Sequence, residues 1–148
     1  RLREKNLRVR LLVCGKNLPA EMNELTPYQE LGVIYAGFVE DIDLYFKACD
    51  VFLNPLLDGG GIKTKLVEAL GFGNMAVSSS NGAIGVDPSI TGGRLKVVAD
   101  FDWDRFAEEV QQALHESPEG DHQLFYQHFS WKNIAHQALQ SLDEPVHD

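Results

Sequence analysis

The sequence is short of positive charge, of cysteine and of long apolar runs. Its 13 lysines and arginines are outnumbered by 22 aspartates and glutamates, which gives a formal net charge of −9. Phosphate backbones and anionic membrane surfaces repel such a chain, so nucleic acid and charged bilayers are disfavoured as partners. No run approaches the ~20 apolar residues of a membrane span and no signal-peptide pattern opens the chain, which together favour a cytoplasmic protein.

Cysteine and histidine are too sparse and too scattered for a disulfide or metal framework. Cys14 and Cys49 each stand inside an apolar run and are predicted to be buried thiols in a reducing compartment. The histidines show no ligand spacing, and surface positions are expected for all of them: His115, His122, His128, His136 and His147. A protein-bound metal is therefore not expected.

The chain alternates short apolar runs with helix-length segments. Strands are predicted over 9–15, 33–38, 51–55, 75–79 and 95–99, and helices over 19–31, 41–49, 62–72 and 102–116. Near-continuous hydrophobic strands that alternate with helices indicate a doubly wound, Rossmann-like parallel sheet in a single α/β domain over 1–148. The tail over 121–148 is predicted to be helical, with Ser130 as the N-cap of one helix.

One stretch combines bare backbone with positive charge: residues 56–70, LLDGGGIKTKLVEAL. The simplest interpretation is a tight glycine turn followed by lysines on a solvated helix face. A phosphate-binding P-loop is set aside, because it needs glycine directly before the lysine and again five positions earlier, where Ile62 and Leu57 stand. The remaining interpretation is an anion site of a different design.

That anion site depends on the start of the helix predicted over 62–72. No Ser, Thr, Asp or Asn stands directly before it as a cap, so its first N–H groups are available to an anion that the glycines allow to approach. Lys63 and Lys65 fall in the first turn, where the helix dipole opposes positive charge by a few tenths to ~1 kcal/mol each. A bound diphosphate would reverse that effect. Glu68 can accept hydrogen bonds from sugar hydroxyls or pair with Lys65, and taken alone the spacing favours the ion pair.

Position in the predicted sheet supports the anion site. Ligands of open α/β sheets bind beyond the carboxyl ends of the strands. The glycine-rich stretch directly follows the third predicted strand, GFVEDID follows the second, and SSNGAIGVDP follows the fourth. We expect these three loops to build one pocket.

Residues 35–86, from YAGFVEDID through DVFLNP and GGGIKTKLVEALGFG to SSNGAIGV, resemble the donor-binding, carboxyl-terminal domain of the family 4 GT-B retaining glycosyltransferases. The family pattern runs from G-x-V through an aspartate-led strand ending in proline to GGG-[IT]-[KR]-x-K-x-x-E-A-L-x-x-G, then a strand and a G-x-x-G loop. The HFSW element at 128–131 is similar to the late helix of the family. The resemblance covers nearly the whole chain.

The resemblance implies a role for each part of the motif. Glu68 corresponds to the glutamate that binds the ribose of the nucleotide. The diphosphate is expected at Gly59, Gly60, Gly61, Lys63 and Lys65, and the nucleobase against Gly37, Phe38 and Val39. The donor is a nucleoside-diphosphate sugar, no further cofactor is implied, and no catalytic residue is assigned.

Two departures from the family pattern matter. Many members carry a glutamate that contacts the donor sugar eight residues before the ribose glutamate, where this chain has Gly60; Asp58 is the nearest acidic residue and is not counted as its replacement. The strand, loop and helix that normally precede the strand at 9–14 have no counterpart in the sequence, nor has the acceptor-binding domain. We therefore expect a piece of a longer enzyme, with strands 9–14 and 51–54 on either side of a gap.

The resemblance thus implies a hexosyl-type glycosyltransferase that moves a sugar from a nucleoside diphosphate to an acceptor hydroxyl with retention. The alternative is a non-catalytic nucleotide-binding or interaction domain with a degenerate glycosyltransferase fold. The acceptor, a glycan or small molecule, would bind through the amino-terminal domain. A cytoplasmic location is expected, with peripheral attachment at the inner membrane face as an alternative for the full-length protein.

Overall fold

The computed structural model describes residues 9–117 and 120–143. Strands and helices alternate along most of the chain, as the sequence predicts. The strands are β1 (Leu11–Cys14), β2 (Val33–Gly37), β3 (Val51–Asn54), β4 (Met75–Ser79) and β5 (Leu95–Val98). The α-helices are α1 (Ile42–Ala48), α2 (Thr64–Gly71), α3 (Trp103–Ala113), α4 (Gln123–Phe129) and α5 (Trp131–Asp143), and short 3-10 segments span Ala20–Leu31 and Pro88–Ile90.

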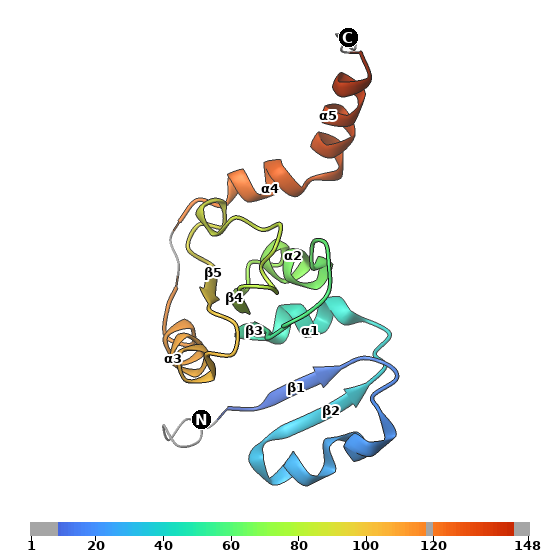
Figure 1. Cartoon of the computed structure of the whole chain (residues 1–148), viewed down its shortest axis with the longest axis vertical. Coiled ribbons are helices and arrows are strands. Elements are labelled where there is room, and N and C mark those ends of the chain that lie inside the picture. Colours follow the sequence, from blue (N-terminus) through green and yellow to red (C-terminus); the bar gives the residue numbers. More distant parts are fainter. Residues whose placement is uncertain (1–8, 118–119, 144–148) are drawn as a thin grey trace.

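All strand pairs in the described residues are parallel, but they form two separate sheets (Figure 1). One sheet is β1–β2, and the other has the order β3-β4-β5. The parallel α/β fold expected from the alternation is confirmed. The expected break is also present, because β1 and β3 are not paired with each other.

The main core covers both faces of the β3-β4-β5 sheet, because successive residues of β4 point to opposite faces. Ala76 lies on one face in a cluster with Leu66 and Leu70 of α2 and Phe125 of α4. Its neighbours Met75 and Val77 lie on the other face with Phe106, Val110 and Ala113 of α3. The apolar residues of α2 and α3 recur at helical spacing, so each helix has one apolar face, and this face packs against the sheet.

Helix α1 packs against this core mainly through one aromatic side chain. Asp41 accepts a hydrogen bond from the Leu44 N–H at 3.3 Å and so caps the helix start. Phe46 is buried, with ring centroids 5.3 Å from Phe72 and 5.8 Å from Phe52. The carbonyl of Phe46 also accepts from Asn74 Nδ2 at 2.8 Å. These contacts attach the segment that follows β2 to the three-stranded sheet.

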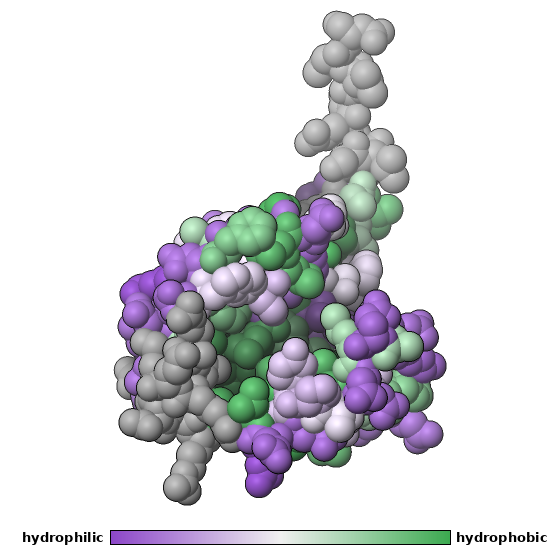
Figure 2. Space-filling model, turned by 60° about the horizontal axis from the view of Figure 1, so that its bottom comes forward, coloured by the Kyte–Doolittle hydropathy of each residue, from purple (hydrophilic) through white to green (hydrophobic). Residues whose placement is uncertain are grey.

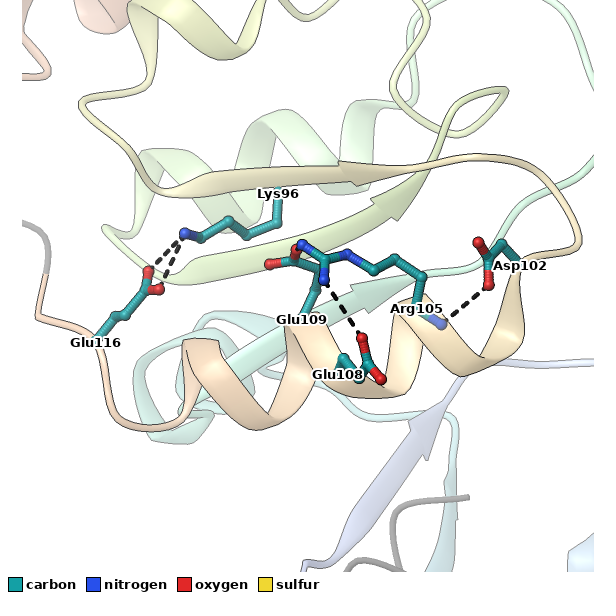
Figure 3. A network of polar contacts seen from close by, with 6 residues as sticks. All are labelled: Lys96, Asp102, Arg105, Glu108, Glu109 and Glu116. Atoms are coloured by element: carbon teal, nitrogen blue, oxygen red, sulfur yellow. Dashed lines mark hydrogen bonds and ion pairs between the residues drawn. The ribbon is translucent and has the colours of Figure 1, made fainter.

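Polar contacts on α3 set where this helix begins and how it meets β5 (Figure 3). Asp102 caps the helix by accepting from the Arg105 N–H at 3.0 Å. The Arg105 guanidinium pairs with Glu108 at 3.3 Å and with the nearly buried Glu109. Lys96 of β5 pairs with Glu116 just beyond the helix end at 2.7 Å.

The helix predicted over 19–31 is wrong in type. Ala20–Leu31 is a kinked 3-10 segment with left-handed backbone at Asn23, Glu24 and Leu25. Pro27 has no N–H for an α-helical hydrogen bond, and none of the residues in the segment is buried. Short helices take most of their stability from an apolar face packed on the rest of the protein, and this segment has no such face.

The burial predicted for the strands is correct for β4 and only partly correct for β1, β2, β3 and β5, since Ile34 of β2 and Val97 of β5 are also exposed. Every residue of β4 is buried, whereas Leu11 and Leu12 of β1 are exposed and Val51 of β3 is half-buried. The predicted burial of Cys14 and Cys49 is likewise only partial. Strands with a neighbour on one side only keep part of their apolar surface in contact with solvent.

The tail forms two helices, as expected. Phe125 of α4 is buried in the main core, and Tyr126 donates to the Gly71 carbonyl at 2.8 Å. Ser130 Oγ accepts from the Asn133 N–H at 3.2 Å, which confirms Ser130 as an N-cap. Helix α5 extends away from the sheets (Figure 1), and Trp131 at its start is exposed. Within the described residues, no helix is long and apolar enough to cross a membrane.

Candidate functional site

The glycine-rich loop between β3 and α2 is closed on itself by one lysine. Lys63 Nζ donates to the carbonyl of Gly59 at 2.5 Å and to those of Gly60 and Gly61 at 3.3 Å each. Gly59 and Gly61 have positive φ angles, and this backbone conformation directs the carbonyls toward the single ammonium group. Residues other than glycine adopt such φ angles only with strain. Asp58 stabilises the turn by accepting from the Gly59 N–H at 2.6 Å.

Helix α2 starts at Thr64, two residues later than predicted, and its N-cap is Lys63. No side chain caps this end of the helix. The first N–H groups of an α-helix have no partner within the helix, and the helix dipole adds partial positive charge at the same end. The N–H groups at the start of α2 are thus available to an anion, and Lys63 and Lys65 stand at the N-cap and in the first turn of the same helix.

Glu68 and Lys65 contact each other on the exposed side of α2. Lys65 Nζ lies 2.7 Å from Glu68 Oε2, and the two side chains are 60% and 43% exposed. The ion pair that the spacing favours is thus present. Because it is exposed, it contributes little stability and leaves both groups available to a ligand.

The loop after β4 packs directly against the glycine-rich loop. A Cβ added at Gly85 would lie 2.5 Å from Cγ1 of Ile62, and one added at Gly82 would lie 2.7 Å from both Asn54 Nδ2 and Ser78 Oγ. Neither position has room for a side chain. The G-x-x-G spacing therefore allows the loops after β3 and β4 to touch.

Buried polar side chains join the same two loops underneath. Asn54 Nδ2 donates to Ser78 Oγ and to the Gly82 carbonyl, each at 2.9 Å. Ser79 Oγ accepts from the Gly82 N–H at 3.1 Å and donates to the Leu56 carbonyl. The side chains of Asn54, Ser78 and Ser79 are almost completely buried. Satisfied buried networks are rigid, so this one holds the two loops in a single geometry.

A second group of predicted residues lies at the end of β2. Phe38 is 61% exposed, and Lys16, which follows β1, places its Nζ 3.8 Å from the centre of the Phe38 ring. Gly37 has a φ of 64° and lets the chain turn there, while Val39 is half-buried. An exposed aromatic ring beside a lysine can stack on a planar base and attract an adjacent phosphate.

The structure brings the predicted residues together in two groups. The residues around the glycine-rich loop and the first two turns of α2 form one group, and the residues at the end of β2 form the other. Both groups lie on the right-hand side in Figure 1, although they stand on different sheets. The third expected loop, after β4, joins the first group through Gly85.

Next to Gly85 the surface is hollowed. Gly85, Val86, Asp87, Ile90 and His128 line an open depression that continues toward α4. The backbone N–H of Ser89, then its side chain, hold the pKa of Asp87 below its usual value, and His128 adds to this effect. Asp87 therefore remains a carboxylate in mildly acidic solution and is a candidate polar contact at the edge of the site.

Metal-binding clusters and activated thiols are not found in the parts of the chain that the structure describes. No group of three or more His, Cys, Asp or Glu side chains there could hold a metal ion. Burial raises the pKa of the Cys14 and Cys49 thiols, so neither is a ready nucleophile. The predicted surface position of His147 lies outside the described residues.

Comparison with protein families identifies the chain. The family model described as glycosyl transferases group 1 matches residues 1–116. The chain belongs to this family. Comparison with curated proteins finds no match.

Three solved structures share the fold of this group 1 domain. The chain superposes on HepE from Anabaena, solved in complex with UDP, with a TM-score of 0.72 and 18% identity, covering 90% of this chain and 40% of HepE. WaaG, a glycosyltransferase involved in lipopolysaccharide biosynthesis, superposes with a TM-score of 0.64 and 18% identity. The match covers 92% of this chain and 38% of WaaG. TarM superposes with a TM-score of 0.74 and 13% identity, and the match covers 97% of this chain and 30% of TarM. The chain thus has the fold of a GT-B carboxyl-terminal domain and spans well under half the length of these proteins.

Sequence reasoning missed some residues that shape the site. The sequence predicts Asn54, Ser78 and Ser79 only as parts of strands, although polar residues at the ends of otherwise apolar strands are a signal for a buried network. No role for Lys16 follows from the sequence pattern, although it directly follows a strand-ending glycine. Its position over Phe38 depends on the pairing of β1 with β2.

Proposed function

We propose that this domain binds the nucleoside-diphosphate sugar donor of a family 4, retaining GT-B glycosyltransferase, and that the whole enzyme transfers a hexosyl group to an acceptor hydroxyl. The observation that carries the proposal is the uncapped start of α2 behind a triple-glycine loop, with Lys63 and Lys65 beside it. Membership of the group 1 family supports glycosyl transfer as the reaction class. The complex of HepE with UDP supports a nucleoside diphosphate as ligand.

Each part of the ligand has a matching surface. The diphosphate would lie at the start of α2, where N–H groups and ammonium groups converge. The ribose would lie one helical turn further on, about 5 Å along the axis, within reach of Glu68. The base would rest against Phe38.

The proposed reaction breaks the bond between the anomeric carbon and the β-phosphate oxygen, and the electron pair stays on the diphosphate. The acceptor oxygen loses its proton and bonds to the anomeric carbon on the same face of the sugar. Negative charge grows on the diphosphate as this happens, and the N–H groups of α2 with Lys63 and Lys65 would stabilise it. The group that takes the proton is not assigned in this chain.

Without a ligand, both lysines of the site are bound by groups of the domain itself. Lys63 lies on the loop carbonyls, and Lys65 lies on Glu68. A diphosphate would replace the neutral carbonyl acceptors of the Lys63 ammonium by ionised phosphate oxygens, so that both partners of each hydrogen bond carry charge. A ribose would likewise draw Glu68 from Lys65. Binding is therefore expected to rearrange these side chains without a change of fold.

A titration of the chain with UDP, GDP, ADP and inorganic pyrophosphate tests the proposal. Amide chemical shifts report both affinity and location. We expect millimolar binding, about −4 kcal/mol, with shifts at residues 59–68 and 37–39 and a preference for one base. Absence of shifts at millimolar nucleotide would refute donor binding. Binding by the full-length protein without any sugar transfer would favour the non-catalytic alternative, for which Gly60 in place of an acidic residue is the motive.

A further inference from the structure

Two short loops are held against each other where β1 and β2 end. The two strands are parallel, so both loops leave the same edge of the sheet (Figure 1). The Gly15 N–H donates to the Gly37 carbonyl at 2.8 Å, and the Tyr35 hydroxyl donates to the Gly15 carbonyl at 2.9 Å. Lys16 and Phe38 directly follow these two glycines in the sequence. The hydrogen bonds therefore keep the backbone positions of Lys16 and Phe38 close together.

The ammonium group of Lys16 lies against one face of the Phe38 ring. Its Nζ is 3.8 Å from the ring centre, and Phe38 is 61% exposed. The negative face of an aromatic ring attracts a cation, but at an exposed site this attraction is weak. A planar base that stacks on this face needs the volume that the ammonium occupies. Since Lys16 is anchored to the end of β1, stacking displaces the ammonium toward the edge of the base.

The surroundings of this lysine and ring leave room for a small polar molecule. A Cβ added at Gly15 or at Gly37 would meet no atom within 4 Å, so the space beside both loops is open. Hydrophilic residues predominate on the right-hand side of the face in Figure 2, the side on which β1 and β2 end in Figure 1, whereas hydrophobic residues line a central hollow. Protein partners favour large apolar patches, and this part of the surface is not one.

The charges next to Phe38 favour a neutral base over a phosphate as the partner of Lys16. Glu40, Asp41 and Asp43 follow Phe38 closely in the sequence, in the loop after β2 and the first turn of α1. Carboxylates repel a phosphate and do not repel an uncharged base. The proposed position of the diphosphate is also elsewhere, at the start of α2.

We propose that Lys16 makes the site selective for nucleotides whose base carries a keto oxygen, uracil or guanine, over those with the amino bases cytosine and adenine. The inference rests on the proposed function, which puts the base against Phe38. A lysine ammonium has three hydrogen-bond donors and no acceptor. The exocyclic oxygens of uracil and guanine accept hydrogen bonds, whereas cytosine and adenine have amino donors at the same positions. A donor that faces a donor leaves both unpaired, which discriminates strongly against the wrong ligand.

Titration of the chain with UDP, CDP, GDP, ADP and inorganic pyrophosphate tests this selectivity. We expect UDP to bind at least about tenfold more tightly than CDP, and GDP at least about tenfold more tightly than ADP. Lys16→Met removes the ammonium and keeps an unbranched side chain. It should reduce both ratios toward one by weakening UDP and GDP, with the affinities for CDP, ADP and pyrophosphate unchanged. Lys47→Met is the matched control, because Lys47 also lies over a phenylalanine, with its Nζ 5.7 Å from the centre of the Phe72 ring.

Two further variants separate a contact with the base from a general effect of charge. Lys16→Glu replaces the donors by an acceptor that can bind the amino group of cytosine, so CDP should become the tighter ligand of the pyrimidine pair. The new carboxylate repels the diphosphate of both nucleotides alike, and the ratio of their affinities cancels this repulsion. Lys16→Arg keeps donors at the position and should keep the preference for UDP.

The titrations distinguish failure of this inference from failure of the proposed function. A wild type that binds nucleotides without a keto preference would overturn the inference, and so would a UDP to CDP ratio unchanged in Lys16→Met and Lys16→Glu. Equal weakening of all five ligands by Lys16→Met would put the ammonium on a phosphate, which also overturns it. Each of these results leaves donor binding intact. If the wild type binds neither the nucleotides nor pyrophosphate, the proposed function fails and the inference fails with it.

Discussion

Ile62 and Gly85 hold the loops after β3 and β4 against each other, because the space that a Cβ at Gly85 would need is occupied by Cγ1 of Ile62, 2.5 Å away. Ile62 stands two residues before α2, and Gly85 lies in the turn after β4. The contact thus determines how closely the two loops approach at the start of α2.

Gly85→Ala is expected to destabilise the fold and to weaken diphosphate binding. A left-handed alanine costs about 1–2 kcal/mol, and the added methyl group displaces Ile62. Gly73→Ala is a matched control, since Gly73 has a similar φ of 83° with nothing within 4 Å. Chemical denaturation and pyrophosphate titration should show a larger loss of stability at Gly85 than at Gly73, and a loss of binding only at Gly85. Adding Ile62→Ala to Gly85→Ala should restore binding; if it does not, the loop contact is unimportant.

Asn54→Ala is expected to lower the free energy of unfolding by about 1–3 kcal/mol, because it removes the buried donor of the Gly82 carbonyl and one of the hydrogen bonds of Ser78 Oγ. Asn133→Ala is the control. Its amide donates to the Gln127 carbonyl at an exposed position, so its loss should cost much less. Urea denaturation measures both variants. Equal losses of unfolding free energy in the two variants would show that the buried network stabilises the fold no more than an exposed hydrogen bond does.

Lys63→Ala and Lys65→Ala should each weaken pyrophosphate binding by about tenfold. Lys65→Ala should change stability by no more than about 0.5 kcal/mol, because its exposed ion pair contributes little and the helix dipole opposes the lysine. Lys63→Ala also removes the cation from the carbonyls of the glycine-rich loop, so faster amide exchange is expected at Gly59–Gly61. Lys47→Ala, at the end of α1, is the control. Unchanged affinity in both site variants would contradict the anion site.

Glu68→Gln should weaken binding of the preferred nucleoside diphosphate at least about tenfold, because the ribose loses a charged acceptor. Pyrophosphate affinity should hold or improve, since a nearby negative charge is gone. Glu108→Gln is a matched control, since Glu108 makes the same i, i+3 pair with Arg105 at 44% exposure, against 43% for Glu68. Calorimetric titration of both variants measures the difference. Equal nucleotide affinities would reduce Glu68 to an ion-pair partner.

The thiol of Cys49 should make stability fall in alkaline solution. Burial, and then the charge of Asp50, raise its pKa above the ordinary value of 9.0. The contribution is fully present below pH 9 and is lost as the pH rises through the raised pKa of the folded state. Denaturation of the wild type and of Cys49→Ala between pH 8 and pH 10 tests this, at about the pH range in which thiols titrate. A pH dependence identical in the two proteins would exclude Cys49 as its source.

Local pattern was enough to predict the strands, most helices and the start of the site. Mainly apolar runs ending at Gly, Pro, Ser or Asp identify β1 to β5, because a buried parallel strand needs apolar residues on both faces. The glycines before Lys63 and the absence of a cap before α2 are likewise visible in the sequence, since helix ends depend on a few adjacent residues. Only Ala20–Leu31 differs in type from its prediction, and none of its residues is buried.

Tertiary structure alone decided which of these local features meet. The contact of Gly85 with Ile62, the network around Asn54 and the position of Lys16 over Phe38 join residues from different strand-end loops. Nothing in the spacing of those residues along the chain specifies these distances. The partial exposure of β1 and β3 was equally invisible in their composition, which matches that of the fully buried β4. The sequence determined which segments can become buried strands, but burial itself requires neighbours on both sides, and the fold provides two for β4 and one each for β1 and β3.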